Sequence, residues 1–341
     1  MMLGRPGVNE LREKLEITFL PVGDGDCALV QFDAGRFNVL IDAGPSKPQH
    51  AVSRTLQHLN RLVPHKVIDL AVVTHHDDDH IGGFLSLLQQ DSGWTIQEML
   101  FNSPRTIGHL LNPGAPQKIS ARHGHQLSEL KSSTNRTVLK TGDRFPFFEQ
   151  KAELVFLAPT EADLRQHGAS VTALPPSPQK IRVRSPFHSA EQWALMPDVF
   201  KSDGSYSNLL SLAFVLRFGR QSWLFLGDAW PSTIVAGLDA VYGAERPHFE
   251  LVKVSHHGSQ GNTTAELVRR FNCTDYVVTA TGRSHPDEAA LRRMVQGTEA
   301  AVTFHFPQKT EGLEELLANA GLTVNYPQPD GLLAFSYEEP K

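Results

Sequence analysis

One short segment constrains this chain more than any other. Residues 74–83 read THHDDDHIGG, with three histidines and three aspartates in six consecutive positions. Burying so many ionisable groups together without cations would be very unfavourable. Imidazole nitrogens and carboxylate oxygens are also the protein ligands that divalent metal ions take. The segment therefore predicts a metal site, with ligands from His75, Asp77, Asp79 and His80.

The surroundings of this segment predict where the site lies. The apolar run VIDLAVV precedes it and is typical of a strand buried on both faces, while IGGFLSLLQQ follows it and predicts a helix. Strands and helices alternate in the first third of the chain and again near 210–295, which predicts an α/β protein with sheets between helices. In the first third, the expected strands are 17–22, 27–32, 37–44 and 67–75, and the expected helices are 50–62 and 81–90.

Composition excludes several classes of protein. The 341 residues include only two cysteines, so neither a disulfide framework nor a cysteine-based zinc site is expected, and a reducing cytoplasm is the simplest location. The formal net charge of -5 argues against a broadly basic nucleic-acid binder, although not against a local basic groove. The first 16 residues have no apolar core and the chain has no long apolar run, so no secretion signal, membrane anchor or membrane span is expected.

The stretch 101–205 has a different texture from the rest, with many prolines, glycines, serines and charges. Within it, residues 173–189 combine several prolines with Lys180, Arg182 and Arg184. We expect one domain over 1–341, with 101–205 as an insertion. Three interpretations of the insertion stay open: a surface loop, a lid that brings cations to a substrate, or a docking surface for a protein partner.

Several motifs, taken in order, resemble those of one known family. The segment 74–83 is similar to the HxHxDH motif of metallo-β-lactamase fold hydrolases, in the HxDxDH variant of the competence protein ComEC. The strand and turn ITFLPVGDGDCALV, the strand VLIDAG, the hairpin at 207–230, LVKVSHHGSQGNT and the late TGRSHPDEAALRRM also resemble that family. The resemblance covers most of the chain except 101–205 and about 298–325. It implies a four-layer αββα metallo-β-lactamase sandwich with an inserted Pro/Ser-rich segment.

The resemblance also implies two divalent ions and their ligands. One ion would be held by His75 and Asp77, and the other by Asp79, His80 and His257. Asp228, which follows the apolar strand SWLFLG, would bridge them.

The chain departs from the family pattern at one position. Many relatives supply a further histidine to the first ion, but no histidine occurs here between His188 and Asp228. Ser207 or Asn208 is expected to face that ion, directly or through water. Mainly oxygen ligands favour manganese or magnesium at this ion, whereas the second, with more histidines, suits zinc.

Other residues are candidates for roles around the ions. His257 is preferred over His256 as a ligand because neighbours on an extended segment point opposite ways. His256 and His285 are candidate proton donors or substrate contacts beside the catalytic metal ligand Asp79. Asp26 and Asp42 follow expected strands and are predicted to orient the metal ligands, although both also fit ordinary turns. Lys253 is a candidate cation near the site, with an exposed surface lysine as the simpler interpretation.

Two ions about 3.5–4 Å apart can hold a bridging hydroxide that attacks phosphorus or a carbonyl carbon. The ComEC-like pattern and the oxygen-rich site favour a phosphodiesterase or nuclease, acting on a nucleic acid or a nucleotide. Six arginines could supply phosphate contacts, although an exposed surface charge is the simpler interpretation of each: Arg182, Arg184, Arg269, Arg270, Arg292 and Arg293. Two alternatives stay open. One is hydrolysis of a carbon-centred bond in a lactone, β-lactam or thioester, and the other is a non-catalytic partner-binding module.

Overall fold

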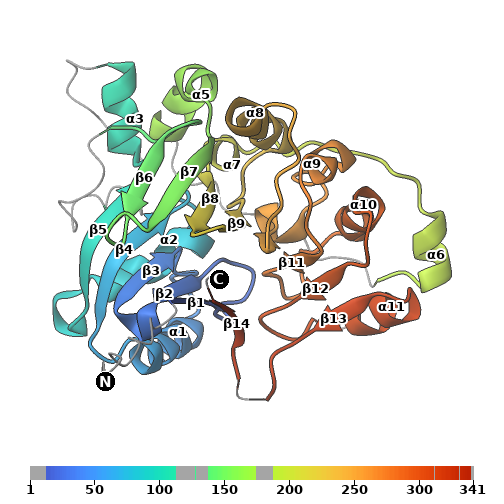
Figure 1. The fold of residues 1–341 in the computed structure, drawn as a ribbon, viewed down its shortest axis with the longest axis horizontal. Coiled ribbons are helices and arrows are strands. Elements are labelled where there is room, and N and C mark those ends of the chain that lie inside the picture. Colours follow the sequence, from blue (N-terminus) through green and yellow to red (C-terminus); the bar gives the residue numbers. More distant parts are fainter. Residues whose placement is uncertain are drawn as a thin grey trace, which may run out of the picture.

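The computed structural model describes residues 13–112, 127, 137–173, 187–310, 312–329 and 331–338. Two sheets form its centre (Figure 1). The first sheet has the order β14-β1-β2-β3-β4-β5, so that strands from the two ends of the described chain lie side by side. Its strands are β1 (Lys14–Phe19), β2 (Ala28–Phe32), β3 (Phe37–Ile41), β4 (Val67–Val73), β5 (Thr95–Phe101) and β14 (Leu333–Glu338).

The second sheet has the order β13-β12-β11-β10-β9-β8-β7-β6. Strands β6 to β9 pair antiparallel, and β9 to β13 pair parallel. Its strands are β6 (Arg144–Phe147), β7 (Ala152–Ala158), β8 (Ala213–Phe218), β9 (Gln221–Phe225), β10 (Leu251–Lys253), β11 (Asp275–Val277), β12 (Thr303–His305) and β13 (Thr323–Asn325).

Three apolar clusters define four layers. Phenylalanines of both sheets, among them Phe19, Phe32 and Phe214, pack in a cluster between the sheets. A second cluster lies under α1 (Gln49–Leu62) and α2 (Asp78–Leu87) on the outer face of the first sheet. A third covers the outer face of the second sheet. The helices on that face are α8 (Pro231–Tyr242), α9 (Ala265–Arg269), α10 (Glu288–Gly297) and α11 (Leu313–Asn319).

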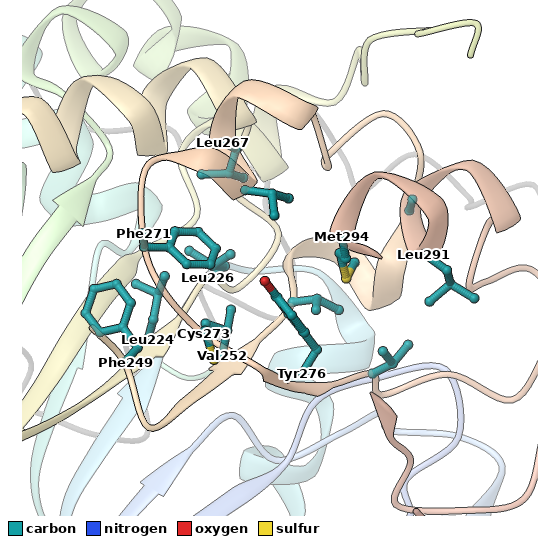
Figure 2. Close-up of a cluster of buried hydrophobic side chains, with 14 of the residues drawn as sticks. Leu224, Leu226, Phe249, Val252, Leu267, Phe271, Cys273, Tyr276, Leu291 and Met294 are labelled. Atoms are coloured by element: carbon teal, nitrogen blue, oxygen red, sulfur yellow. The ribbon is translucent and has the colours of Figure 1, made fainter. Parts of the chain in front are cut away.

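Figure 2 shows part of this third cluster. Strand residues Leu224, Val252 and Tyr276 lie beneath Leu267 of α9 and Met294 of α10. The predicted α/β class with two sheets and outer helices is confirmed, and the arrangement is consistent with the metallo-β-lactamase fold. None of the described helices is both long enough and apolar enough to cross a membrane.

The range predicted as an insertion needs correction. Residues 144–158 contain β6 and β7, and β7 pairs with β8 along a mostly buried stretch, so this part belongs to the second sheet. Polar residues before and after this apolar hairpin obscured its strand character. The rest of the range holds α3 (Pro104–Leu111), α5 (Glu161–Ala173) and α6 (Ala190–Leu195). Lys180, Arg182 and Arg184 lie outside the described residues.

Candidate metal centre

The candidate ligands meet at one edge of the two sheets, where parallel strands end. His75 follows β4 and Asp42 follows β3 in the first sheet. Asp228 follows β9 and His257 follows β10 in the second sheet. Since the carboxyl ends of neighbouring parallel strands lie side by side, residues far apart in sequence converge at this edge.

The Gly-Asp turn after β1 packs closely against the start of the helix that carries Asp79 and His80. The amide of Asp26 donates to the carbonyl of Asp79 over 3.1 Å, so the Gly-Asp turn packs on the first turn of α2. A side chain at Gly25 would place its Cβ 2.6 Å from that carbonyl oxygen, so only glycine allows the approach. The helix begins at Asp78, three residues earlier than predicted, and therefore includes Asp79 and His80.

The candidate ligand atoms form overlapping groups. His75, His80 and Asp228 make one, while Asp79, His80 and His257 make another, and within each group the ligand atoms lie within 4.8 Å of one another. His80 Nε2 lies 3.3 Å from Asp228 Oδ1, and His257 Nε2 lies 3.3 Å from Asp79 Oδ2. His80 belongs to both groups, and Asp228 Oδ2 also lies 3.9 Å from His257 Nε2, so the histidines and acids form one centre.

These atoms are buried without a hydrogen bond in the described part of the chain. The unpartnered atoms are Nε2 of His75, His80 and His257 and Oδ1 of Asp79 and Asp228. An unpartnered buried polar group is costly, so a cluster of five such atoms facing one another favours a further occupant. Imidazole nitrogens and carboxylate oxygens in this arrangement fit divalent metal ions.

The opposite ring nitrogens are held by carboxylate–threonine pairs. Asp42 accepts hydrogen bonds from the amide and hydroxyl of Thr74, over 2.8 and 2.7 Å, and lies 2.8 Å from His80 Nδ1. Because the Thr74 hydroxyl donates to Asp42, its oxygen accepts from His75 Nδ1 at 3.1 Å. In the neutral rings of His75 and His80, Nδ1 thus carries the proton, and the lone pair of Nε2 points toward the centre.

A second pair of the same kind serves His257. Thr279 Oγ1 donates to Asp26 Oδ1 over 2.6 Å and lies 3.2 Å from His257 Nδ1. Lys253 Nζ also contacts Asp26, and it donates to the carbonyl of Gly227 over 3.3 Å. Burial by itself would raise the pKa of Asp26, but the Lys253 ammonium and the neighbouring imidazoles hold it well below its usual value.

The interpretation of Lys253 as an exposed lysine is wrong, because only 3% of the residue is exposed. It lies at the end of β10, between the parallel strands β9 and β11. The sequence LVKVSHH gives no sign of this burial, which a paired carboxylate from another strand makes tolerable.

Asp77 and Ser207 occupy the side of the centre where the family pattern lacks a histidine. Asp77 Oδ2 lies 3.6 Å from His75 Nε2, and Ser207 Oγ donates to Asp77 Oδ1 over 2.7 Å. Asn208 instead donates to Asp203 Oδ2 over 2.7 Å and lies 3.3 Å from His256 Nδ1. Ser207 therefore faces the first candidate ion's ligands, and Asn208 faces His256.

The premise that separated His256 from His257 is wrong. Both residues have left-handed backbone angles, with φ of 46° and 53°, in the turn Ser255–Gly258 rather than on an extended segment. Their Nε2 atoms lie 3.7 and 3.9 Å from the same oxygen, Asp228 Oδ2. Both imidazoles therefore reach Asp228.

His285 lies beside this histidine pair. Its ring centroid is 5.0 Å from that of His256 and 6.4 Å from that of His257. Its Nδ1 is 3.6 Å from Asp287 Oδ2, and burial lowers its pKa, which favours a neutral ring at pH 7. The turn that follows β11 thus brings a third imidazole to the rim of the site.

Sequence reasoning missed several polar residues around the ligands. Asp203 Oδ2 accepts hydrogen bonds from Asn208 and Asn262 and lies 3.5 Å from His256 Nδ1. His76 lies 3.4 Å from Ser207 Oγ. Asp203 and Asn262 do not lie in a cluster of histidines and acids that would mark them as site residues. His76 does, because it lies inside the 74–83 segment.

The candidate phosphate-binding arginines are not gathered at the centre. Arg292 and Arg293 are buried, and their guanidinium groups donate to carbonyls of the segment 193–199 and to Asp198. Arg270 pairs with Asp239, while Arg269 is exposed on α9. Neither interpretation of Arg292 and Arg293, as phosphate contacts or as exposed surface charges, is correct, because both are buried and anchor the chain segment before Asp203.

Comparison with known proteins supports the fold. Residues 37–174 match the family model of the Beta-lactamase superfamily domain. None of the curated proteins compared with this chain matches it in sequence. Taken with the candidate ligand groups, the family match and the fold indicate a metal-dependent hydrolase.

Solved structures that align with this protein along most of its length share little sequence identity with it. The metallo-beta-lactamase fold protein YhfI from Bacillus subtilis is 11% identical, over 96% of this chain and 100% of that chain, with a TM-score of 0.43. A diphosphatase of the PhnP family is 13% identical, over 96% and 98%, with a TM-score of 0.43. Zn2+-bound PqqB from Methylobacterium extorquens is 10% identical, over 91% and 86%, with a TM-score of 0.41. Similarity at this level says nothing about the substrate.

Proposed function

We propose that this protein is a two-metal phosphodiesterase or nuclease of the metallo-β-lactamase family, related to the ComEC-type hydrolases. The observation that carries the proposal is the set of five buried, unpartnered ligand atoms that face one another at the sheet edge. His75 and Asp77 would hold one ion, and Asp79, His80 and His257 the other. Asp228 would bridge them, since its two oxygens lie toward different histidines.

When bound, two divalent ions would polarise the substrate and lower the pKa of water. The chain's own residues orient the imidazole rings of the ligands and fix which ring nitrogen carries the proton. Asp42 and Thr74 keep the protons of His80 and His75 on Nδ1, and Asp26 with Thr279 does the same for His257.

A leaving alkoxide would need a proton, and the imidazole of His256 at the rim offers one. Burial opposes the charged form of His256, but Asp228, 3.7 Å away, and Asp203 raise its pKa. We assign the proton donor to His256 and a substrate contact to the neutral ring of His285 next to it, because neither ring is required in the two ligand groups at the centre.

A phosphate substrate is favoured by the oxygen-rich first site. The carboxylates of Asp77 and Asp228 lie next to His75, and the hydroxyl of Ser207 donates a hydrogen bond to Asp77. Oxygen ligands suit manganese or magnesium, and the histidine-rich second site suits zinc. The substrate would be a nucleic acid or nucleotide. The segments of 101–205 outside β6 and β7 would serve as a lid within a single domain, or as the surface for a protein partner.

The first test is hydrolysis by purified protein reconstituted with manganese, zinc or magnesium. The substrates are bis-p-nitrophenyl phosphate, labelled single- and double-stranded DNA, nitrocefin and a lactone. We expect metal-dependent cleavage of the phosphodiesters that is lost in Asp79→Ala and Asp228→Asn. Asp239→Ala on α8, which removes an aspartate that is paired with Arg270 and belongs to no candidate ligand group, is the matched control.

Metal content of each variant, measured by mass spectrometry, separates loss of ions from loss of chemistry. Cleavage of nitrocefin or the lactone with no cleavage of phosphodiesters would overturn the phosphodiesterase assignment and favour a carbon-centred substrate. Two bound ions with no cleavage of any substrate would favour a module that requires a partner.

A further inference from the structure

Three aromatic rings from separate parts of the chain gather beside the candidate metal centre. The rings of Tyr206 and His167 are stacked, with centroids 4.5 Å apart and planes 16° apart. Trp230 is also stacked relative to Tyr206, with centroids 6.3 Å apart and planes 28° apart. His167 belongs to α5, Tyr206 opens α7 (Tyr206–Leu209), and Trp230 precedes α8. We call His167, Tyr206 and Trp230 the aromatic cluster.

The cluster borders the oxygen-rich side of the centre. Ser207, the next residue after Tyr206, donates its hydroxyl proton to Asp77 over 2.7 Å. Trp230 follows Asp228 by two residues in the loop that ends at α8. The backbone therefore links the cluster directly to Asp77's partner and to the bridging aspartate.

Packing alone does not account for the position of Tyr206. The small apolar core nearby consists of Ile107, Leu164, Leu209 and Leu210, with Trp230 packed against it. Tyr206 is not part of that core, and 40% of it is exposed. Stacking with His167 and Trp230 nevertheless restricts the Tyr206 ring, so less side-chain entropy would be lost when a ligand contacts it.

We propose that the aromatic cluster is the subsite on which a nucleobase next to the scissile phosphate stacks. This inference rests on the proposed phosphodiesterase function and names its substrate class, a nucleic acid with an unpaired base. Aromatic side chains bind single-stranded nucleic acids by stacking, since every base has a π-face. A base within a duplex has both faces covered, so the subsite predicts a preference for single strands or nucleotides over intact duplexes.

The test compares two oligonucleotides that share the same phosphodiester backbone. One carries bases, and the other carries abasic tetrahydrofuran units at every position. We expect the wild-type protein to have a kcat/KM about 5- to 150-fold higher for the base-bearing strand. That ratio should fall toward one in Tyr206→Ala and be retained in Tyr206→Phe, which keeps the aromatic ring. Equal ratios in wild type and Tyr206→Ala would overturn the subsite.

A binding measurement keeps this inference separate from the proposed function. The Asp79→Ala protein, with and without Tyr206→Ala, is titrated with fluorescently labelled base-bearing and abasic strands. If no phosphodiester is hydrolysed but base-dependent binding is lost with Tyr206, the subsite stands and the proposed function fails. If both strands bind equally, or neither binds, the subsite is overturned, whatever the hydrolysis assay shows.

Discussion

The buried ammonium of Lys253 gives the sharpest test of how the centre is built. Lys253→Met keeps the length and apolar stem of the side chain but removes the charge that contacts Asp26. The change leaves a carboxylate that is only 6% exposed, on the side of His257 away from the ligand groups. We expect the metal-free protein to lose stability, because an uncompensated buried charge is left behind.

The structure limits the size of this loss. Removing one partner of a buried ion pair costs about 3–5 kcal/mol. Asp26 would keep the hydroxyl of Thr279 at 2.6 Å and the ring of His257 at 3.3 Å, so we expect the lower end, about 3 kcal/mol. Unfolding entropy of about 2.1 cal/mol/K per residue gives about 0.7 kcal/mol/K for 341 residues. The melting temperature should then fall by about 4 °C.

Calorimetry of the metal-free proteins measures this shift. The double variant Lys253→Met/Asp26→Asn removes both charges, and it should be destabilised by less than the sum of the two single variants. Lys140→Met, which removes an exposed lysine paired with Glu161, is the control and should shift the melting temperature by less than about 1 °C. Additive effects of the two single changes, or a Lys253→Met protein that melts with the wild type, would refute the reasoning.

Three further predictions concern groups with perturbed pKa values. Burial raises the pKa of the Cys273 thiol to about 12 and that of Cys27 further still, so a thiol reagent at pH 8 should label neither until the protein unfolds. His305 holds the pKa of Asp275 below its usual value, so the stability from this pair is present above about pH 4 and lost as the pH falls. Asp275→Asn should flatten the acid limb of a melting-temperature profile against pH. In the metal-free protein, burial opposes the charged form of His257, but Asp228 and Asp26 raise its pKa to about 10. Metal binding at pH 7 must displace such protons, so calorimetric heats should depend on the ionisation enthalpy of the buffer, and affinity should rise with pH.

Much of the fold could be predicted because its signals are local. The run VIDLAVV has the strand length and apolar character of β4, and helical spacing at 50–62 matches α1 within one residue. The segment 74–83 contains four candidate ligands within six positions, so their closeness in space can be predicted without long-range information. The assignment of Asp228 rests on the resemblance of the 207–230 hairpin to the family, and its position after the apolar strand SWLFLG agrees with it.

The errors arose where partners come from distant strands. Lys253 was interpreted as exposed because its carboxylate partner, Asp26, lies on a turn more than two hundred residues earlier. The sequence presents Arg292 and Arg293 as exposed surface charges or phosphate contacts, yet both are buried and donate hydrogen bonds to carbonyls of 193–199. The orientation of His256 depends on two consecutive residues with left-handed backbone angles, a conformation that few non-glycine residues adopt.

Lys253 also explains how a cation can lie beneath a site that collects acids for other cations. Asp26 is the carboxylate it contacts, and no oxygen of Asp26 belongs to the two ligand groups formed by His75, His80 and His257 with Asp79 or Asp228. A fixed ammonium there neutralises the acid that orients His257, while Asp79 and Asp228 keep unpartnered oxygens toward the centre. Without the ammonium, Asp26 would be the nearest alternative acid for an ion, beside Asp42 and His80, which also meet within 4.8 Å. The lysine thus separates the carboxylates that we propose as ion ligands from the carboxylate that orients His257, and Lys253→Met would remove this separation.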